Sequence, residues 1–272
     1  MHRIKKKINF IFNKYIIKNT LDTNTIIKHL KDCGIEKNDT VMVHSSMSKI
    51  GVLDNGALTI IEALQSLISK NGLIILPSFP HRHMFNYLES SPIFRLAESP
   101  SMNGIISETF RTSSDVFRSL HPTHPVCAWG RNAETLVKGH EHSLCPFDDS
   151  SPYKKLIDLN AKVLLIGVHF QNLTMCRVIE DLVDNYPSPY LEKNYAITCL
   201  DANKKRHIVY TKCHDPNRSK VRNNTIFFPY LNDLGLVKHA YIGNAKTLMV
   251  HSKDLFQIQK KLHLKNIYGY EK

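Results

Sequence analysis

The sequence predicts an α/β protein whose sheet is mixed, largely parallel and flanked by helices. The apolar runs Leu73–Leu76 and Lys162–Gly167 are typical of strands that are buried on both faces. Between residues 39 and 76 the order is strand, polar turn, helix and strand, which is the order of a parallel pair joined by a crossover helix. After Pro187 and Pro189 the chain changes to shorter alternating segments, which indicate an antiparallel portion.

The individual elements follow from the spacing of the apolar residues. Thr25–Gly34 is predicted to be an amphipathic helix that ends at its glycine. Asp39–His44 is predicted to be a buried strand, and Leu58–Ser69 has apolar residues at helical spacing before Gly72 ends the pattern. The later predictions are helices at Asn103–Arg111 and Thr174–Asn185, strands at Tyr195–Leu200 and His207–Lys212, and two short apolar runs within Gly235–Val250.

Composition limits the classes of function. A chain of 272 residues with 42% apolar residues has ample core for one large or two small domains, and no apolar run approaches the roughly 18 residues that a membrane span needs. The net charge of +12 favours an anionic partner. Because no nucleic-acid motif accompanies it, we expect a phosphate-bearing cofactor and substrate and no nucleic acid.

The basic N-terminus, residues 1–24, is predicted to form a helix. Ile4, Ile8, Ile11 and Tyr15 share one face of such a helix, and lysines occupy the others. A first helix that packs on the domain is the favoured interpretation, and weak attachment to a membrane surface is the alternative. A secretory signal is not indicated.

The cysteines and histidines show no metal-binding pattern. The six cysteines are scattered without a CxxC pair, so reduced thiols in a cytoplasmic protein are expected. The histidines His124, His140, His142 and His169 are irregularly spaced, and no metal is predicted. A cysteine nucleophile is considered less favourable than small buried thiols.

Three stretches together carry a resemblance to a known family. They are VMVHSSMSKIG (41–51), GLIILPSF (72–79) and the long segment 106–140, which SPYKKL (151–156) and VLLIGV (163–168) extend. In this order they resemble the aminoglycoside 3-N-acetyltransferase family, and IGNAK (242–246) is similar to its closing segment. The resemblance implies two lobes with the active site between them. It also implies transfer of an acyl group from acyl-CoA to a sugar amine, without a metal, by direct attack in a ternary complex.

The resemblance divides the chain into parts. Residues 25–185 are expected to form the acyl-CoA-binding core, and residues 186–272 a second lobe with antiparallel strands that binds the acceptor. A homo-oligomer is compatible with this organisation.

Residues for coenzyme A are expected after the first strand, where amides and hydroxyls commonly face phosphates or a pantetheine arm. Arg111 is expected to pair with phosphate, as are Arg118 and Arg131 in a wider set, and a solvated surface charge is the alternative for each. The predicted cofactor-binding residues are Ser45, Ser46, Met47, Ser48, Arg111 and Ser151.

The chain departs from the family pattern after Val168. The family has Thr, then His three residues on, then Glu three residues beyond; here these positions hold Thr174, Arg177 and Glu180. Arginine cannot accept a proton at neutral pH, so Glu180 becomes the candidate base, and an i,i+3 pair with Arg177 is the alternative. Arg177, Thr174 and His169 are predicted to bind the acceptor.

Two further side chains are predicted to be catalytic. His121 matches the family's His-Pro pair and is expected to line the site, with a structural turn histidine as the alternative. Ser78 follows a strand and is expected to donate to the oxyanion or orient the amine, with a turn hydroxyl as the alternative.

The acceptor is predicted from charge. A basic cleft repels a polycationic aminoglycoside and attracts an amino sugar linked to a nucleoside diphosphate. The favoured acceptor is therefore a nucleotide-linked 4-amino-4,6-dideoxyhexose for surface glycan synthesis. The alternatives are aminoglycoside 3-N-acetylation and a degenerate acyl-CoA-binding protein without catalysis.

Overall fold

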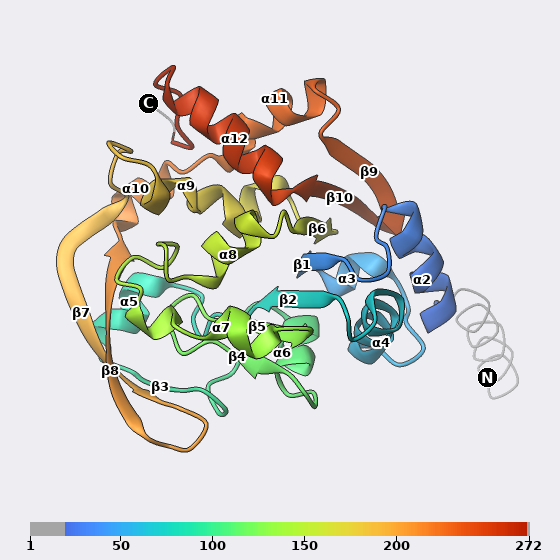
Figure 1. Ribbon diagram of the computed structural model, residues 1–272, viewed down its shortest axis with the longest axis horizontal. Coiled ribbons are helices and arrows are strands. Elements are labelled where there is room, and N and C mark those ends of the chain that lie inside the picture. The colour runs from blue at the N-terminus through green and yellow to red at the C-terminus, as the bar shows by residue number, and fades with distance from the viewer. Residues whose placement is uncertain (1–19, 271–272) are drawn as a thin grey trace, which may run out of the picture.

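The computed structural model describes residues 20–270 and contains a seven-stranded sheet with helices on both faces and a smaller three-stranded sheet at one end (Figure 1). The strand order of the main sheet is β4-β5-β2-β1-β6-β10-β9, and that of the second sheet is β3-β7-β8. The predicted mixed α/β class is confirmed.

Parallel pairing in the main sheet is confined to its three central strands. These are β1 (Thr40–Ser45), β2 (Leu73–Pro77) and β6 (Lys162–Ile166), and β1 pairs in parallel with both of the others. Antiparallel strands flank this centre: β5 (Val126–Gly130) and β4 (Phe117–Arg118) beside β2, and β10 (Ala245–His251) and β9 (Val237–Ile242) beside β6. The sheet is therefore less parallel than the sequence predicts.

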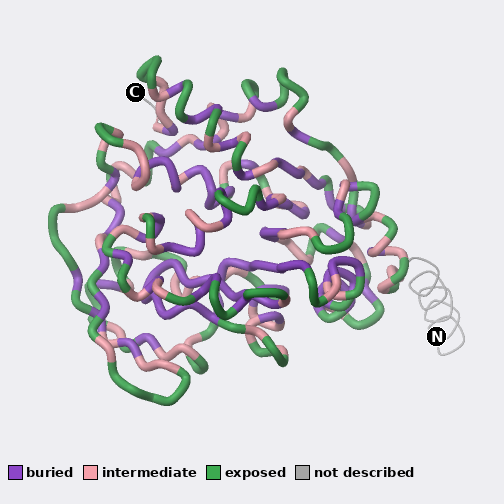
Figure 2. Tube along the Cα trace, viewed as in Figure 1, coloured by how far each residue is buried: buried purple, intermediate pink, exposed green. Residues whose placement is uncertain are grey.

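The central strands are buried on both faces because alternate side chains enter two different cores. In β1, Val41 and Val43 pack with the helices α2 (Thr23–Asp32) and α4 (Ala57–Ile68), whereas Met42 packs on the opposite face. In β6, Leu164 and Ile166 join the first core, and Val163 and Leu165 join the second. Figure 2 shows the buried residues concentrated along these strands.

The helices surround the main sheet and connect it to the second one. The α-helices are α2 (Thr23–Asp32), α3 (Met47–Ile50), α4 (Ala57–Ile68), α5 (Met84–Glu89), α6 (Ile105–Arg111), α7 (Ala133–Val137), α8 (Pro152–Asp158), α9 (Ile179–Leu182), α10 (Pro216–Lys220), α11 (Phe228–Asp233) and α12 (Ser252–His263). Four short 3-10 helices are η1 (His140–His142), η2 (Phe170–Asn172), η3 (Thr174–Arg177) and η4 (Asn224–Phe227). The helix predicted at Thr174–Asn185 is thus divided into η3 and α9, and the chain is extended again at Val183.

The second sheet combines distant parts of the chain. It consists of β7 (Tyr190–Leu200) and β8 (Arg206–His214), which form an antiparallel hairpin, and β3 (Ile93–Arg95), which pairs in parallel with β7. Phe94, Tyr195 and Ile197 lie in its own small core. The sheets do not follow the expected boundary at residue 186, because β9 and β10 return to the main sheet and β3 comes from the first part of the chain.

Other expectations concern features outside the sheets. The basic helix predicted over residues 1–24 falls largely on residues 1–19, which lie outside the described residues. All six cysteines are free thiols. Between residues 20 and 270, no helix is long and apolar enough to cross a membrane, and no group of three or more potential ligands is arranged to hold a metal ion.

Candidate active site

The carboxyl ends of the three parallel strands meet at one edge of the main sheet, where α/β proteins commonly bind ligands. The side chains that follow β1, β2 and β6 enclose a cavity of about 290 Å³, which we call the central pocket. It is lined by His44, Ser45, Pro77, Phe79, Asn103, Ser107, Val168, Asn172, Thr174 and Arg177. The sheet topology therefore creates this cavity, and Ser45, Thr174 and Arg177 of the predicted site residues line it.

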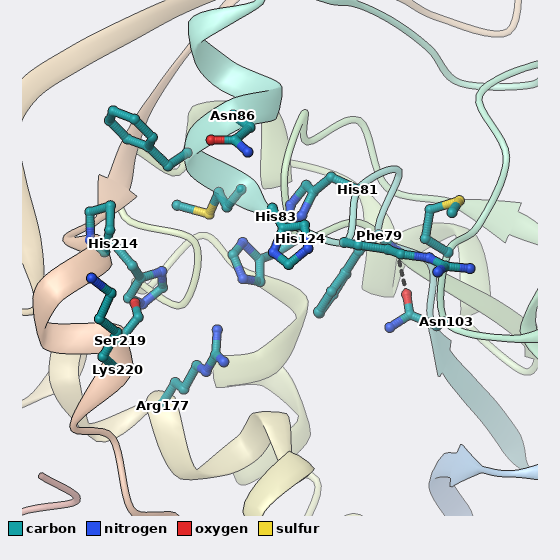
Figure 3. A pocket seen from close by; sticks show the side chains of 15 residues that line it. Phe79, His81, His83, Asn86, Asn103, His124, Arg177, His214, Ser219 and Lys220 are labelled. Carbon is teal, nitrogen blue, oxygen red and sulfur yellow. Dashed lines mark hydrogen bonds between the residues drawn. The ribbon is translucent and has the colours of Figure 1, made fainter.

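A larger cavity of about 680 Å³, the histidine pocket, lies beside the central pocket and shares Phe79, Asn103 and Arg177 with it. In Figure 3, His214, Ser219 and Lys220 form one side, Phe79 and Asn103 the opposite side, and Arg177 extends toward the histidines between them. It is lined by Phe79, His81, Arg82, His83, Met84, Phe85, Asn86, Met102, Asn103, His124, Arg177, His214, Pro216, Ser219 and Lys220.

A third cavity of about 640 Å³, the lysine pocket, adjoins the central pocket at Val168. Its lining residues are Lys49, Gly167, Val168, His169, Phe170, Thr225, Phe228, Asn244, Ala245, Lys246 and Leu248. Gly167 has φ +65°, and a Cβ there would lie 2.7 Å from the Cβ of Lys49, so only glycine fits at this bend. His169, predicted to bind the acceptor, lies in this pocket, and its Nδ1 accepts a hydrogen bond from the amide of Gln171 at 3.2 Å.

The three pockets carry positive charge only. Arg82, Arg177 and Lys220 line the histidine pocket, and Lys49 and Lys246 line the lysine pocket. No aspartate or glutamate of the part of the chain that the structure describes lines any of the three. These pockets are therefore suited to ligands with negative groups.

Arg177 is the cation common to the two inner pockets. Within residues 20–270 its side chain has neither a hydrogen bond nor an ion pair, since Glu180, its expected i,i+3 partner, is bound elsewhere. Burial, and then the neighbouring Arg222, lower the pKa of Arg177 to about 10, so that it remains a cation at neutral pH. Arg177 is available to a ligand.

Glu180 lies behind the histidine pocket and not in its lining. Its carboxylate accepts hydrogen bonds from both terminal nitrogens of Arg222 and from the Tyr270 hydroxyl at 2.8 Å. Burial alone would raise the pKa of Glu180, but Arg222 and His214 overcome this effect and lower it to about 2. A carboxylate with that pKa is a weak proton acceptor, so the geometry favours a different role from the predicted general base.

His214 connects Glu180 to the histidine pocket. It is the last residue of β8, its side chain lines the pocket, and its Nε2 lies 3.5 Å from Oε2 of Glu180. The ring packs against Tyr190, with ring centroids 4.6 Å apart, and against His124 at 5.7 Å. Burial is the main cause that lowers the pKa of His214 to about 4, although Glu180 acts in the opposite direction.

His121 and Ser78 are completely buried and line none of the three pockets. Nδ1 of His121 accepts the amide hydrogen of His124 at 3.1 Å and that of Thr123 at 3.3 Å, and the ring stacks on His140. The backbone of Ser78 accepts a hydrogen bond from Arg118 at 2.6 Å. The contacts of Nδ1 hold the His121 ring in place, whereas its Nε2 and the Ser78 hydroxyl have no hydrogen-bond partner within residues 20–270. The predicted catalytic roles of both residues stay predictions.

The residues predicted for coenzyme A are dispersed. Ser46 is the residue before α3, and Met47 and Ser48 begin the helix. None of them lines the three pockets, whereas the next residue, Lys49, lines the lysine pocket. Arg111 is paired with Glu108 through hydrogen bonds of 2.8 and 2.6 Å. Ser151 caps α8 by accepting the amide hydrogen of Lys154. Of this set, Ser45 alone reaches a pocket.

Asn103 and Phe79 line the site, although neither is among the residues predicted from the sequence. Oδ1 of Asn103 accepts the amide hydrogen of Phe79 at 2.6 Å, so its Nδ2 is the end that donates toward the pockets (Figure 3). The quoted motif GLIILPSF contained Phe79, and Asn103 began a predicted helix. Their positions at element ends were the signal that could have identified them.

Comparison with known proteins gives a consistent result. The family model for aminoglycoside 3-N-acetyltransferase matches residues 42–263. The SPbeta prophage-derived aminoglycoside N(3')-acetyltransferase-like protein YokD of Bacillus subtilis is 30% identical over 197 residues, which cover 65% of this chain and 70% of that protein. Aminoglycoside N(3)-acetyltransferase IV of Salmonella sp is 26% identical, with 85% of this chain and 82% of the relative covered.

Solved structures have the same fold. A binary complex of AAC-IIIb with CoASH superposes with a TM-score of 0.78 at 20% identity and covers 93% of this chain and 100% of its own. The apoenzyme of aminoglycoside acetyltransferase AAC(3)-IVa gives a TM-score of 0.72 at 25% identity, with 88% and 86% covered.

Proposed function

The chain belongs to the aminoglycoside 3-N-acetyltransferase family, and from this premise we propose that it transfers an acyl group from acyl-CoA to the amine of an acceptor that also carries negative charge. The relatives support the reaction class, since the curated relatives that it matches are named as N-acetyltransferases or as acetyltransferase-like. The charge of the acceptor is proposed from this chain's own pockets.

The single observation that carries the proposal is the lining of the histidine pocket. Arg82, Arg177 and Lys220 contribute three cations there, and no carboxylate of the described residues offsets them. An aminoglycoside with several ammonium groups would meet like charge in this pocket, which costs binding free energy. A phosphate or diphosphate on the acceptor would instead form charge-assisted hydrogen bonds with arginine.

Acyl-CoA would enter through the lysine pocket. Lys49 and Lys246 are positioned to meet its phosphates, and the apolar side chains of Phe170 and Phe228 can pack against its adenine. The pantetheine arm would then pass Val168 into the central pocket. This path brings the thioester to the junction with the histidine pocket, beside Arg177 and Asn103.

The chemistry at the junction is amide formation. The acceptor amine attacks the thioester carbonyl carbon, the C–N bond forms, and the C–S bond breaks to release coenzyme A. The Nδ2 group of Asn103 is the donor placed to stabilise the developing oxyanion, and Arg177 is placed to bind the negative group of the acceptor. Both groups lie in the lining that the two inner pockets share.

Two acceptor classes fit this proposal to different degrees. We propose a nucleotide-linked amino sugar, such as a 4-amino-4,6-dideoxyhexose for surface glycan synthesis, on the ground of charge alone. An aminoglycoside is the second candidate, and it is favoured by the names of the relatives, several of which are aminoglycoside acetyltransferases.

A thiol-release assay with acetyl-CoA tests the proposal. The acceptors are a dTDP-linked 4-amino-4,6-dideoxyhexose, the same sugar as its uncharged methyl glycoside, and kanamycin. We expect the nucleotide sugar to have the highest kcat/KM, and the methyl glycoside to lose at least tenfold. Turnover on kanamycin above that on both sugars would overturn the anionic acceptor while leaving the acyl-transfer reaction intact.

A further inference from the structure

The histidine side chain next to Glu180 does not come from the position at which the family motif has its histidine. The family's histidine position holds Arg177, and His214 approaches the same carboxylate from the end of β8. We propose that His214 is the general base that accepts the proton of the acceptor amine, and that Glu180 is its positioning residue. The inference rests on the proposed acyl transfer and identifies a catalytic residue for it.

The hydrogen-bonding capacity of Glu180 determines the tautomer of His214. The carboxylate is ionised at neutral pH and can only accept hydrogen bonds, and it already accepts them from Arg222 and Tyr270. Nε2 of His214, 3.5 Å from Oε2, must therefore carry the hydrogen for the contact to be attractive. Nδ1 is then the nitrogen with the free lone pair, and this pairing is the arrangement by which carboxylates orient catalytic histidines.

Neither ring nitrogen of His214 has a hydrogen-bond partner among residues 20–270, although the residue is only 6% exposed. Nε2 has the 3.5 Å electrostatic contact with Glu180, and Nδ1 has no polar contact of that kind. Buried nitrogen atoms without partners are uncommon, because they lose their contact with water and gain nothing in return. The ring contributes to the lining of the histidine pocket. An acceptor amine in that pocket would supply the missing donor.

Burial is the main cause that keeps His214 neutral, since it disfavours the charged imidazolium and lowers the pKa. Glu180 faces Nε2, the rings of His124 and Tyr190 pack against its faces, and the cations Arg177 and Arg222 lie near it. The two cations oppose its protonation and Glu180 favours it. The balance leaves a neutral imidazole that becomes charged only during the reaction, when Glu180 stabilises the imidazolium.

The proton that the amine loses as the C–N bond forms is the proton that the sulfur gains when the C–S bond breaks. Nδ1 of His214 takes the proton from the attacking amine as the C–N bond forms. When the C–S bond breaks, the imidazolium returns this proton to the thiolate sulfur, so that coenzyme A leaves as a thiol. Arg177 could not perform this step, because it holds its own proton throughout.

The test compares two histidines on one strand. In the first variant, His214→Gln removes the base. In the matched control, His207→Gln removes a histidine at the other end of β8, whose Nε2 lies 2.8 Å from Oδ2 of Asp201, away from the three pockets. We expect His214→Gln to lower kcat by at least 10²-fold with KM for acetyl-CoA within twofold, and His207→Gln to keep both values within twofold.

The pH profile separates a catalytic from a structural effect. In the wild type, kcat should fall at acid pH with an inflection from one group, and His214→Gln should lack this inflection while its residual rate follows hydroxide. If His214→Gln keeps kcat and the wild-type profile, or if His124→Gln alone removes the inflection, the assignment to His214 is overturned, although acyl transfer itself stands.

A second measurement does not depend on turnover. Long-range ¹⁵N–¹H correlation spectra of the histidine rings, assigned with His214→Gln, report which nitrogen carries hydrogen. We expect Nε2 of His214 to be protonated and Nδ1 to be bare at pH 7, and Glu180→Gln to disturb this preference. A hydrogen on Nδ1 in the wild type would refute the proposal even if no acceptor were turned over, whereas a bare Nδ1 beside an inactive enzyme would place the failure in the proposed function.

Discussion

Two neighbouring groups of histidines differ in whether their ring nitrogens are hydrogen-bonded. The core group contains His121 and His140, and the pocket group contains His214. His140 is fully bonded: its ring nitrogens contact Oγ of Ser119 at 2.9 Å and the carbonyl of Pro146 at 3.1 Å, and its ring stacks on His121 at 4.3 Å. His214 lies in the pocket wall, and its Nδ1 has no partner in the described part of the chain. The comparison teaches that burial alone does not distinguish a structural histidine from one available to a ligand, because His140 is bonded at both nitrogens, whereas His214 lines a cavity with neither nitrogen hydrogen-bonded within residues 20–270.

Acidification should cause the largest loss of stability, because it protonates buried histidines. Burial lowers the pKa of His121 to about 3 and those of His44 and His214 to about 4, so that the unfolded chain binds more protons between pH 4 and 6.5. Stability therefore falls as the pH decreases from 6.5, by about 3 kcal/mol each for His44 and His214 and by about 5 kcal/mol for His121, and each loss stops once the pH is below the folded pKa. Urea denaturation at half-unit pH steps measures this, and a flat free energy of unfolding from pH 7 to 4.5 would contradict it.

Glu180→Gln should give the next largest loss of stability, because it removes the carboxylate that pairs with Arg222 and approaches His214. Arg222 would remain buried without its counter-charge, and the expected loss of unfolding free energy is about 3–5 kcal/mol. Urea denaturation is the measurement. The matched control is Glu89→Gln, an exposed carboxylate that accepts hydrogen bonds from Lys193 and Tyr195, for which we expect a much smaller loss. Equal losses in the two variants would mean that the buried pair with Arg222 contributes no more to stability than the exposed pair with Lys193.

His140→Phe tests whether a fully bonded histidine of the core group contributes to stability but not to turnover. It keeps a ring against His121 but leaves Ser119 and Pro146 without their partner, at an expected cost of about 2–4 kcal/mol of unfolding free energy. Because His140 lines none of the three pockets, turnover per folded molecule should stay within twofold. A large loss of kcat in a variant that is fully folded would place His140 in the chemistry and contradict the division between the two groups.

Arg177→Met should have the smallest effect and acts on the acceptor. Removal of the unpaired cation should raise KM for an anionic acceptor about tenfold, or about 1.4 kcal/mol, while an aminoglycoside should bind equally well or better. Steady-state kinetics at low and high salt measure this. Lys70→Met removes one exposed charge, paired with Asp115, and should leave both acceptors unaffected. A matching loss with Lys70→Met would show that net charge alone is responsible.

Much of the fold could be predicted because it depends on local pattern. The predicted apolar runs form β2 and β6, whereas the polar turn predicted between β1 and Gly51 contains the short helix α3. Thr174 and Arg177 were identified from motif spacing and do line the central pocket. The predicted helix over Thr174–Asn185 was wrong in its extent, because the segment divides into η3 and α9, which pack against α12, and is extended at Val183.

The sequence by itself determined the fold class, the family motifs and the positive charge, because apolar spacing and composition act over short stretches of chain. The tertiary structure alone decided which polar side chains meet. It brought Arg222 to Glu180 across 42 residues and placed His214 beside that carboxylate, and thereby assigned Glu180 a partner that no spacing rule predicts. Contacts of this kind depend on how the end of β8 and the segment after α10 approach α9, and such long-range packing leaves no periodic pattern in the sequence.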